Sequence, residues 1–122
     1  MTIDVALAGA GAFGIKHLDA MSRIDDVNVV SVVGRTLEPT REVAERYGID
    51  HVTTDLAESL ALSEVDAVVL ATPTQMHAEQ SIACLEAGKH VEVEIPLCDN
   101  LADGRRVAED LLAEVPREEL IE

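Results

Sequence analysis

The chain has 122 residues, enough for one domain, and 24 Asp and Glu residues outnumber nine Lys and Arg residues, which gives a net charge of −15 at pH 7. This charge excludes proteins that recognise nucleic acid or anionic membranes through a basic patch, and the apolar content of 48% excludes an acidic disordered tail. The sequence has no apolar run of about 18 residues and no secretory signal, so we expect a cytoplasmic globular domain that binds neither nucleic acid nor a membrane.

The first half of the chain alternates apolar runs with amphipathic segments. Runs rich in β-branched residues predict strands at Ile3–Ala8 and Val27–Val33. Helical spacing of apolar residues predicts helices at 13–24 and 40–47. The second of these helices has Pro39 in its first turn and ends at Gly48, a left-handed cap.

The second half continues the same alternation. Three further strands are predicted, at His51–Thr53, 65–71 and 90–94. The helices between and after them are predicted at 55–62 with Asp55 as N-cap, at 75–87 with Thr74 as N-cap and Gly88 as the closing residue, and from Asp99 or Asn100 to residue 114.

The segment Gly9-Ala10-Gly11-Ala12-Phe13-Gly14 has the pattern G-x-G-x-x-G between a predicted strand and a predicted helix. Gly9 permits the tight turn, Gly11 lets the backbone approach a pyrophosphate, and Gly14 allows close packing of the helix on the sheet. The free N–H groups of the first helical turn, including those of Ala12 and Phe13, then hold the phosphates without a lysine. The alternative is a tight turn between strand and helix that binds no ligand.

Strands that alternate with helices imply parallel strands joined by right-handed crossovers. We therefore predict an α/β fold, a doubly wound parallel sheet of the Rossmann type with strand order 3-2-1-4-5, because the glycine loop and Thr72-Pro73 must meet at the switch point between the first and fourth strands. Residues 1–115 are expected to form this NAD(P)-binding domain, and residues 116–122 a C-terminal tail.

The residues after the second strand, Val33-Gly34-Arg35-Thr36, decide between the two nicotinamide cofactors. NAD-binding proteins usually carry Asp or Glu here, whose carboxylate accepts hydrogen bonds from the ribose 2′-hydroxyl. Gly34 leaves room for a 2′-phosphate, and Arg35 and Thr36 can donate hydrogen bonds to it. We predict NADP as the cofactor, with NAD second, and we predict that Gly34→Asp reverses the preference; the alternative is that Arg35 is a solvated loop residue.

The histidines and cysteines offer few further candidates. His77 lies in the first turn of the predicted fourth helix, where it either contacts the nicotinamide half of the cofactor, with a possible catalytic role, or is structural, which is the more frequent case. His17 is expected to be a packing or solvated residue. No pair among the four histidines has the local spacing of a metal site, so no metal is predicted. Cys84 is expected in the core and Cys98 in a loop.

Two glutamates lie on one face of the predicted fifth strand. Glu94 is at its carboxyl end, where α/β sheets bind ligands. Glu92 is unusual in a strand covered on both faces, and we interpret it as protection of an exposed sheet edge.

The run Ala71-Thr72-Pro73-Thr74-Gln75-Met76-His77-Ala78-Glu79-Gln80 and the run Ala87-Gly88-Lys89-His90-Val91, with the glycine loop, resemble the nucleotide-binding half of the Gfo/Idh/MocA oxidoreductases. The resemblance extends over about residues 3–113. It implies a small-molecule substrate, homo-oligomers among full-length relatives, and additional cofactor contacts from Ala71, Thr72, Pro73, His77, Glu94 and Pro96.

Within this family, the residues are most similar to members that act in aromatic compound catabolism. They oxidise the cyclic hemiacetal of 4-carboxy-2-hydroxymuconate-6-semialdehyde to 2-pyrone-4,6-dicarboxylate, with hydride transfer to NADP. Glu94-Ile95-Pro96 stands where most of the family has Glu-Lys-Pro. The missing lysine, which usually touches substrate or nicotinamide, argues against a general sugar dehydrogenase.

The family's second domain, an α+β domain that supplies most substrate contacts and usually a catalytic histidine, has no counterpart in the 122 residues. Segment 117–122 is also too charged for a central sixth strand. We therefore expect this chain alone to bind the dinucleotide and to be inactive, with no residue assigned as certainly catalytic. The alternative function is a non-catalytic dinucleotide-binding module or scaffold.

Overall fold

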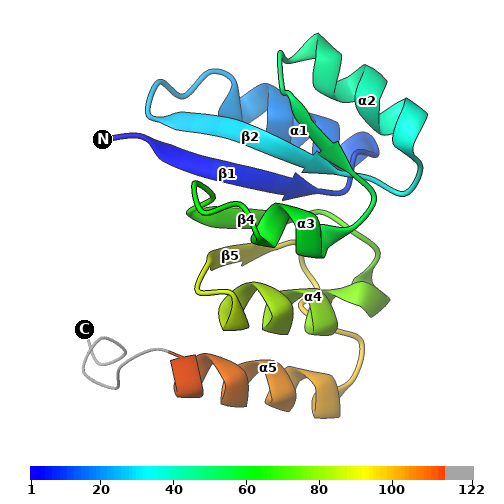
Figure 1. The fold of residues 1–122 in the computed structure, drawn as a ribbon. Helices are drawn as coiled ribbons and strands as arrows, with labels where there is room; N and C mark the ends of the chain where they lie inside the picture. Colours follow the sequence, from blue (N-terminus) through cyan, green and yellow to red (C-terminus); the bar gives the residue numbers. More distant parts are fainter. Residues whose placement is uncertain (115–122) are drawn as a thin grey trace.

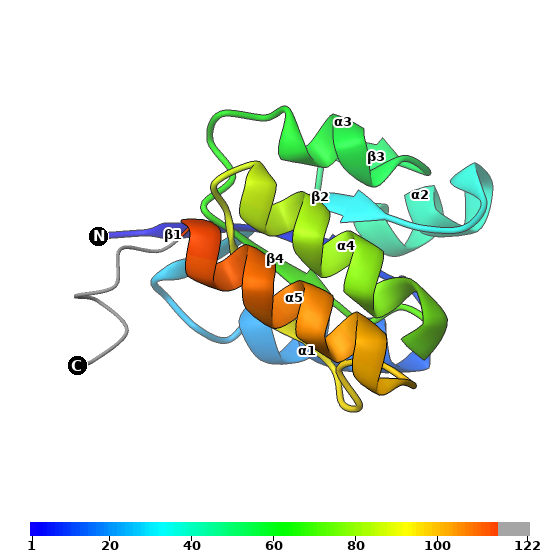
Figure 2. The same ribbon diagram turned by 90° about the horizontal axis from the view of Figure 1, so that it is seen from below.

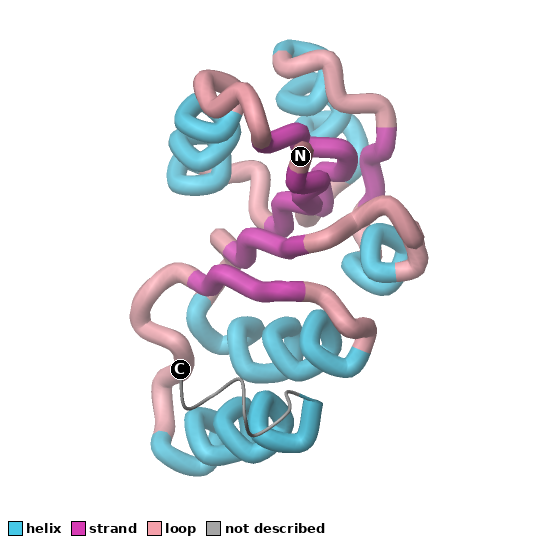
Figure 3. The backbone as a smooth tube through the Cα atoms, turned by 90° about the vertical axis from the view of Figure 1, so that its left-hand side faces the viewer, coloured by secondary structure: helices cyan, strands magenta, loops and turns pink. Residues whose placement is uncertain are grey.

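The computed structural model describes residues 1–114, whose five strands form one twisted parallel sheet with helices on both faces (Figures 1 and 3). The sheet order β3-β2-β1-β4-β5 confirms the predicted doubly wound fold. The tail predicted at 116–122 lies outside the described residues. The strands are β1 (Ile3–Ala8), β2 (Val27–Val33), β3 (His51–Thr53), β4 (Ala67–Leu70) and β5 (His90–Val93).

The helices are those predicted, with shifted ends. The helices are α1 (Ala12–Met21), α2 (Leu37–Arg46), α3 (Leu56–Leu60), α4 (Thr74–Glu86) and α5 (Leu101–Glu114). Helix α2 begins three residues earlier than predicted, because a proline is tolerated anywhere in the first turn, where N–H groups have no partner within the helix. None of the described helices is long and apolar enough to cross a membrane.

The caps explain where several helices begin and end. The Asp55 carboxylate accepts a hydrogen bond from the Ala57 N–H, as predicted, and the Asn100 side chain accepts one from the Asp103 N–H at 2.8 Å. Thr74, predicted as a cap, is instead the first residue of α4, because Pro73 holds the extended conformation that precedes the helix. Gly48 and Gly88 have φ values of +69° and +76°, which confirms both as left-handed caps.

The core lies in two layers, because alternate residues of central strand β1 point to opposite faces of the sheet. Val5 and Leu7 pack with α1 and α2, in a cluster that includes Leu18, Val32, Val43, Ala44, Ile49 and Val69. Ala6 and Ala8 pack on the other face, in a cluster that includes Val33, Val65, Val68, Leu70 and Cys84.

Strand β5 is the edge of the described sheet, and its two faces differ. Val91 and Val93 pack against the cluster on the α4 face. Glu92 pairs in register with Val69, whose side chain belongs to the cluster on the α1 face, so Glu92 points to that opposite side. Helix α5 packs beside α4 (Figures 1 and 2), which leaves Glu92 exposed. The charge of Glu92 therefore suits both a sheet edge and a face that α5 does not cover.

Full burial of Cys84 in the core predicts a pH dependence of stability. Burial raises the pKa of this thiol from 9.0 to about 12. Between these two values the unfolded chain loses the thiol proton while the folded chain keeps it, so stability should fall by about 1.4 kcal/mol per pH unit as pH rises. We expect urea unfolding to show this loss in the parent and in Cys98→Ala, but not in Cys84→Ala; parallel curves for all three proteins would contradict the assignment.

Candidate functional site

The loops that follow β1, β2, β4 and β5 meet at one end of the sheet, where the carboxyl ends of parallel strands gather. These loops hold the residues predicted to contact a cofactor, at 9–14, 34–36, 71–73 and 94–96. Backbone hydrogen bonds connect the start of each loop to a neighbouring strand. They run from Gly9 N–H to Val33 O at 2.8 Å, from Gly34 N–H to Thr53 O at 3.0 Å, from Ala71 N–H to Ala8 O at 2.8 Å, and from Glu94 N–H to Leu70 O at 3.0 Å.

Gly9 is required by two independent features of the loop after β1. Its φ of +104° is a conformation that L side chains rarely adopt. A Cβ at this position would also lie 2.3 Å from the Ala71 carbonyl oxygen, in the loop after β4. The tight turn was predictable from the motif, whereas the contact with Ala71 depends on the two loops meeting in space.

Gly14 and Gly11 differ in what surrounds them. A Cβ on Gly14 would lie 1.7 Å from the Gly9 carbonyl oxygen, so α1 begins in contact with its own glycine loop as well as close to the sheet. A Cβ on Gly11 would meet no atom within 4 Å, and the φ of Gly11, −83°, is open to any residue. The fold itself therefore does not need glycine at position 11, and open space there fits the close approach of an external group.

The amino end of α1 can bind an anion. No side chain caps it at Gly11, and its first turn contains no acidic residue, so its N–H groups and the positive end of its dipole face the loop. Phe13 in this turn is 65% exposed, and the Lys16 ammonium lies 5.4 Å from the centre of its ring. These features fit the phosphates of a dinucleotide.

Gly34 has a structural explanation that the sequence did not reveal. A Cβ there would lie 1.7 Å from Oγ1 of Thr40, whose hydroxyl donates to the Thr36 carbonyl at 2.7 Å. Any side chain at position 34 would disturb the start of α2, so Gly34→Asp would test local packing as well as cofactor preference. Arg35 and Thr36 are exposed, and Arg35 forms no ion pair with any described residue.

His77 joins two of the four loops. The residue is 1% exposed, and its two ring nitrogens lie 2.7 Å from the Thr72 carbonyl oxygen and 2.9 Å from the Pro96 carbonyl oxygen. The Thr72 hydroxyl also donates to the Gln80 side chain in α4. This burial and bonding favour the structural interpretation of His77, in which it holds the loops after β4 and β5 together.

His17 is the site residue that the sequence interpretation missed. Its Nε2 contacts Oε1 of Glu94 across a separation of 77 residues, and both side chains are partly buried. His17 lies in the second turn of α1, and Glu94 follows β5, so the predicted strand order already placed both near the same end of the sheet. That placement was the available signal, but contact depends on tertiary structure.

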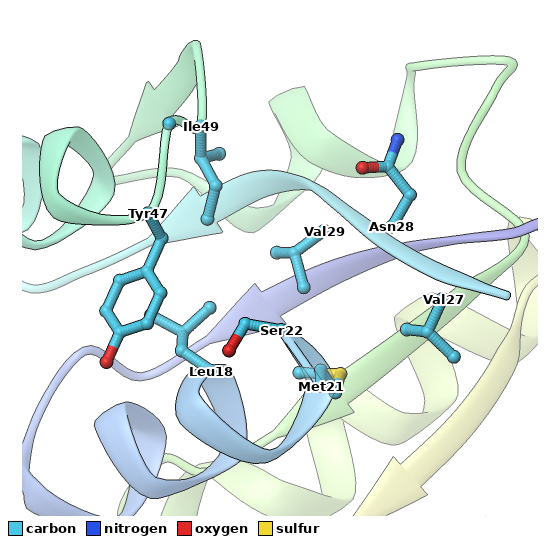
Figure 4. A pocket seen from close by; sticks show the side chains of 9 residues that line it. Leu18, Met21, Ser22, Val27, Asn28, Val29, Tyr47 and Ile49 are labelled. Atoms are coloured by element: carbon cyan, nitrogen blue, oxygen red, sulfur yellow. The ribbon is translucent and has the colours of Figure 1, made fainter. Parts of the chain in front are cut away.

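A separate pocket lies at the other end of the sheet (Figure 4). It is formed by the last turn of α1, the start of β2 and the segment after α2, and its lining includes Leu18, Val27, Tyr47 and Ile49. None of the predicted cofactor residues lines it. The glycine loop and this pocket are therefore distinct features.

Residues 3–114 match the family model Gfo/Idh/MocA, described as an oxidoreductase family with an NAD-binding Rossmann fold. The 4-carboxy-2-hydroxymuconate-6-semialdehyde dehydrogenase of Sphingobium sp. (strain SYK-6) is 61% identical over 103 residues, which are 84% of this chain and 33% of that protein. The myo-inositol 2-dehydrogenase of Thermotoga maritima is 34% identical over 106 residues, 87% of this chain and 32% of that protein.

Solved structures with bound cofactors share the fold. GenD2 from gentamicin A biosynthesis, in complex with NAD, has a TM-score of 0.87 and 32% identity over 93% of this chain and 32% of that one. KijD10, a 3-ketoreductase from Actinomadura kijaniata in complex with TDP-benzene and NADP, has a TM-score of 0.85 and 26% identity over 93% of this chain and 36% of that one. The chain spans about a third of the length of the curated relatives it matches.

Proposed function

Because the chain belongs to the Gfo/Idh/MocA oxidoreductase family, we propose that it is the NADP-binding domain of a dehydrogenase that oxidises the hemiacetal of 4-carboxy-2-hydroxymuconate-6-semialdehyde to 2-pyrone-4,6-dicarboxylate. The substrate is supported by the 61% identity to the Sphingobium enzyme of that name. The observation that carries cofactor binding is the open space at Gly11 beside an uncapped helix end. The nicotinamide dinucleotide, when bound, supplies the hydride acceptor for this oxidation.

The chain's own residues then have defined tasks. The first-turn N–H groups of α1 hold the pyrophosphate, with Gly9 and Gly14 keeping the loop and helix close enough to present them. His77 keeps the loops of Thr72 and Pro96 together on the nicotinamide side of the site. Glu94, held by His17, lies at the end of β5, where it can accept a hydrogen bond from a ribose hydroxyl.

Arg35 is proposed to select NADP through the 2′-phosphate. A charge-assisted hydrogen bond contributes about 1.5–3 kcal/mol, so we expect NADPH to bind about ten- to a hundredfold more tightly than NADH. Arg35→Leu should remove this advantage and leave NADH affinity unchanged. The matched control is Arg46→Leu, which makes the same charge change at the far end of α2.

Calorimetric titration of the parent and both variants with NADPH and NADH tests this proposal. Equal affinities of the parent for the two cofactors would contradict the NADP preference and leave dinucleotide binding in place. No binding of either cofactor would contradict the proposed function itself.

A non-catalytic dinucleotide-binding module or scaffold is the second candidate. It is favoured by the lack of an evident catalytic group at two positions expected near the nicotinamide. His77 is buried with both ring nitrogens near carbonyl oxygens, and the position of the family's lysine is taken by Ile95, an apolar side chain that is 90% exposed. Turnover by the chain alone would exclude this second candidate, whereas absence of turnover is expected from both.

A further inference from the structure

We propose that His17, Glu92 and Glu94 form a binding site for a divalent transition-metal ion such as Zn²⁺ or Co²⁺. Each residue offers one ligand atom, an imidazole nitrogen or a carboxylate oxygen, and the three atoms all lie within 4.8 Å of one another. A metal ion at bond lengths of about 2 Å can reach ligand atoms spaced in this way after small rotations of the side chains.

The fold explains why these three side chains converge. Successive residues of a strand point to opposite faces, so Glu92 and Glu94 lie on one face of the chain at the end of β5. Helix α1 packs on this same face of the sheet. His17, in the second turn of α1, contacts Glu94 through Nε2. His17 of α1 and Glu94 after β5, 77 positions apart in the sequence, thus contribute to one cluster, which local spacing of histidines does not reveal.

The donor set determines the class of metal. One imidazole nitrogen and two carboxylate oxygens suit Zn²⁺, Co²⁺ or Ni²⁺, whereas Mg²⁺ prefers oxygen ligands alone in an octahedral arrangement. Three protein ligands also leave room for water at the remaining positions, as in zinc sites that are not purely structural.

The electrostatics of the cluster favour a cation. Glu92 and Glu94 bring two carboxylates together in a chain with a net charge of −15. Among residues 1–114, the ion pairs formed by arginine involve Asp19, Glu38 and Asp103, and none involves either of these glutamates. His17 is the paired neighbour of Glu94, and as a neutral ring it offers a lone pair to a metal.

The test is a titration of cofactor-free chain with CoCl₂, followed by the visible absorption of bound Co²⁺, and with ZnCl₂, followed by calorimetry. The variants are His17→Gln and Glu92→Gln. Their matched controls are His90→Gln and Glu86→Gln, which change the same residue types at exposed positions outside the cluster. The metal titration contains no dinucleotide, and Glu92 is exposed and has no part in the proposed cofactor contacts. The result of the titration therefore does not depend on the proposed cofactor function.

We expect one Co²⁺ or Zn²⁺ per chain, a loss of affinity of about tenfold or more in each cluster variant, and no change in the controls. MgCl₂ is expected to bind more weakly than ZnCl₂. Absence of Co²⁺ and Zn²⁺ binding in the parent would overturn the proposal, and so would equal affinities of the parent and Glu92→Gln.

Discussion

Replacing Gly11 with valine should weaken dinucleotide binding by about a hundredfold or more, equivalent to about 2.7 kcal/mol, without unfolding the protein. A Cβ at this position meets no protein atom within 4 Å, and the backbone of Gly11 is in an extended conformation that valine adopts readily. The side chain would occupy the space through which a pyrophosphate approaches the first turn of α1. Calorimetry with NADPH measures the affinity, and thermal unfolding measures the stability.

Gly14→Ala, unlike Gly11→Val, should destabilise the protein even when no cofactor is bound. Its methyl group would lie 1.7 Å from the Gly9 carbonyl oxygen, a backbone atom that cannot move without shifting the loop or α1. Overpacking of this kind costs about 1–3 kcal/mol and occasionally more, so a fall in unfolding temperature should accompany any loss of binding.

Gly104→Ala is the control for both glycine variants. This glycine lies in α5, and the nearest atom to an added Cβ is the Cys98 sulfur at 3.2 Å, at the end of a side chain. Neither binding nor stability should fall. If Gly11→Val bound NADPH as tightly as the parent, the glycine loop would not be the pyrophosphate site.

The purified chain of 122 residues should bind NADPH and yet form none from NADP and the proposed semialdehyde substrate. Oxidation of the hemiacetal requires a general base within hydrogen-bond reach of the hydroxyl proton. The substrate's carboxylates also need cationic partners that hold it in a reactive geometry. In the described residues, His77 is buried between two carbonyl oxygens and Ile95 supplies no charge.

Turnover is measured by the rise in absorbance of NADPH. The positive control for the quality of the substrate is the full-length Sphingobium dehydrogenase, which is 61% identical to this chain over 103 residues. Turnover near that of an ordinary enzyme, about 10 s⁻¹, would show that the catalytic groups lie within this chain. His77 would then be the first candidate for the base, and the non-catalytic alternative would be excluded.

Much of the fold was predictable because it depends on local patterns. Strands β1, β2 and β3 begin and end at the predicted residues. The first two lie in runs rich in apolar and β-branched residues, as is usual for parallel strands covered on both faces. The glycine motif between β1 and α1 placed the switch point, and the switch point determined the order 3-2-1-4-5. Helix ends were less predictable: α1 stops three residues early, and α2 starts three residues early.

Two features of the site depended on tertiary structure. Gly34 was predicted to leave room for a phosphate, and only the structure reveals that Thr40 in the next helix also excludes a side chain there. His17 looked like a packing residue until α1 and β5 brought it to Glu94. Sequence patterns report which residues are buried and which dihedral angles they need, because those are properties of short segments. Contacts between residues that are far apart in the chain arise only when the sheet brings its loops to one end, and no local pattern encodes them.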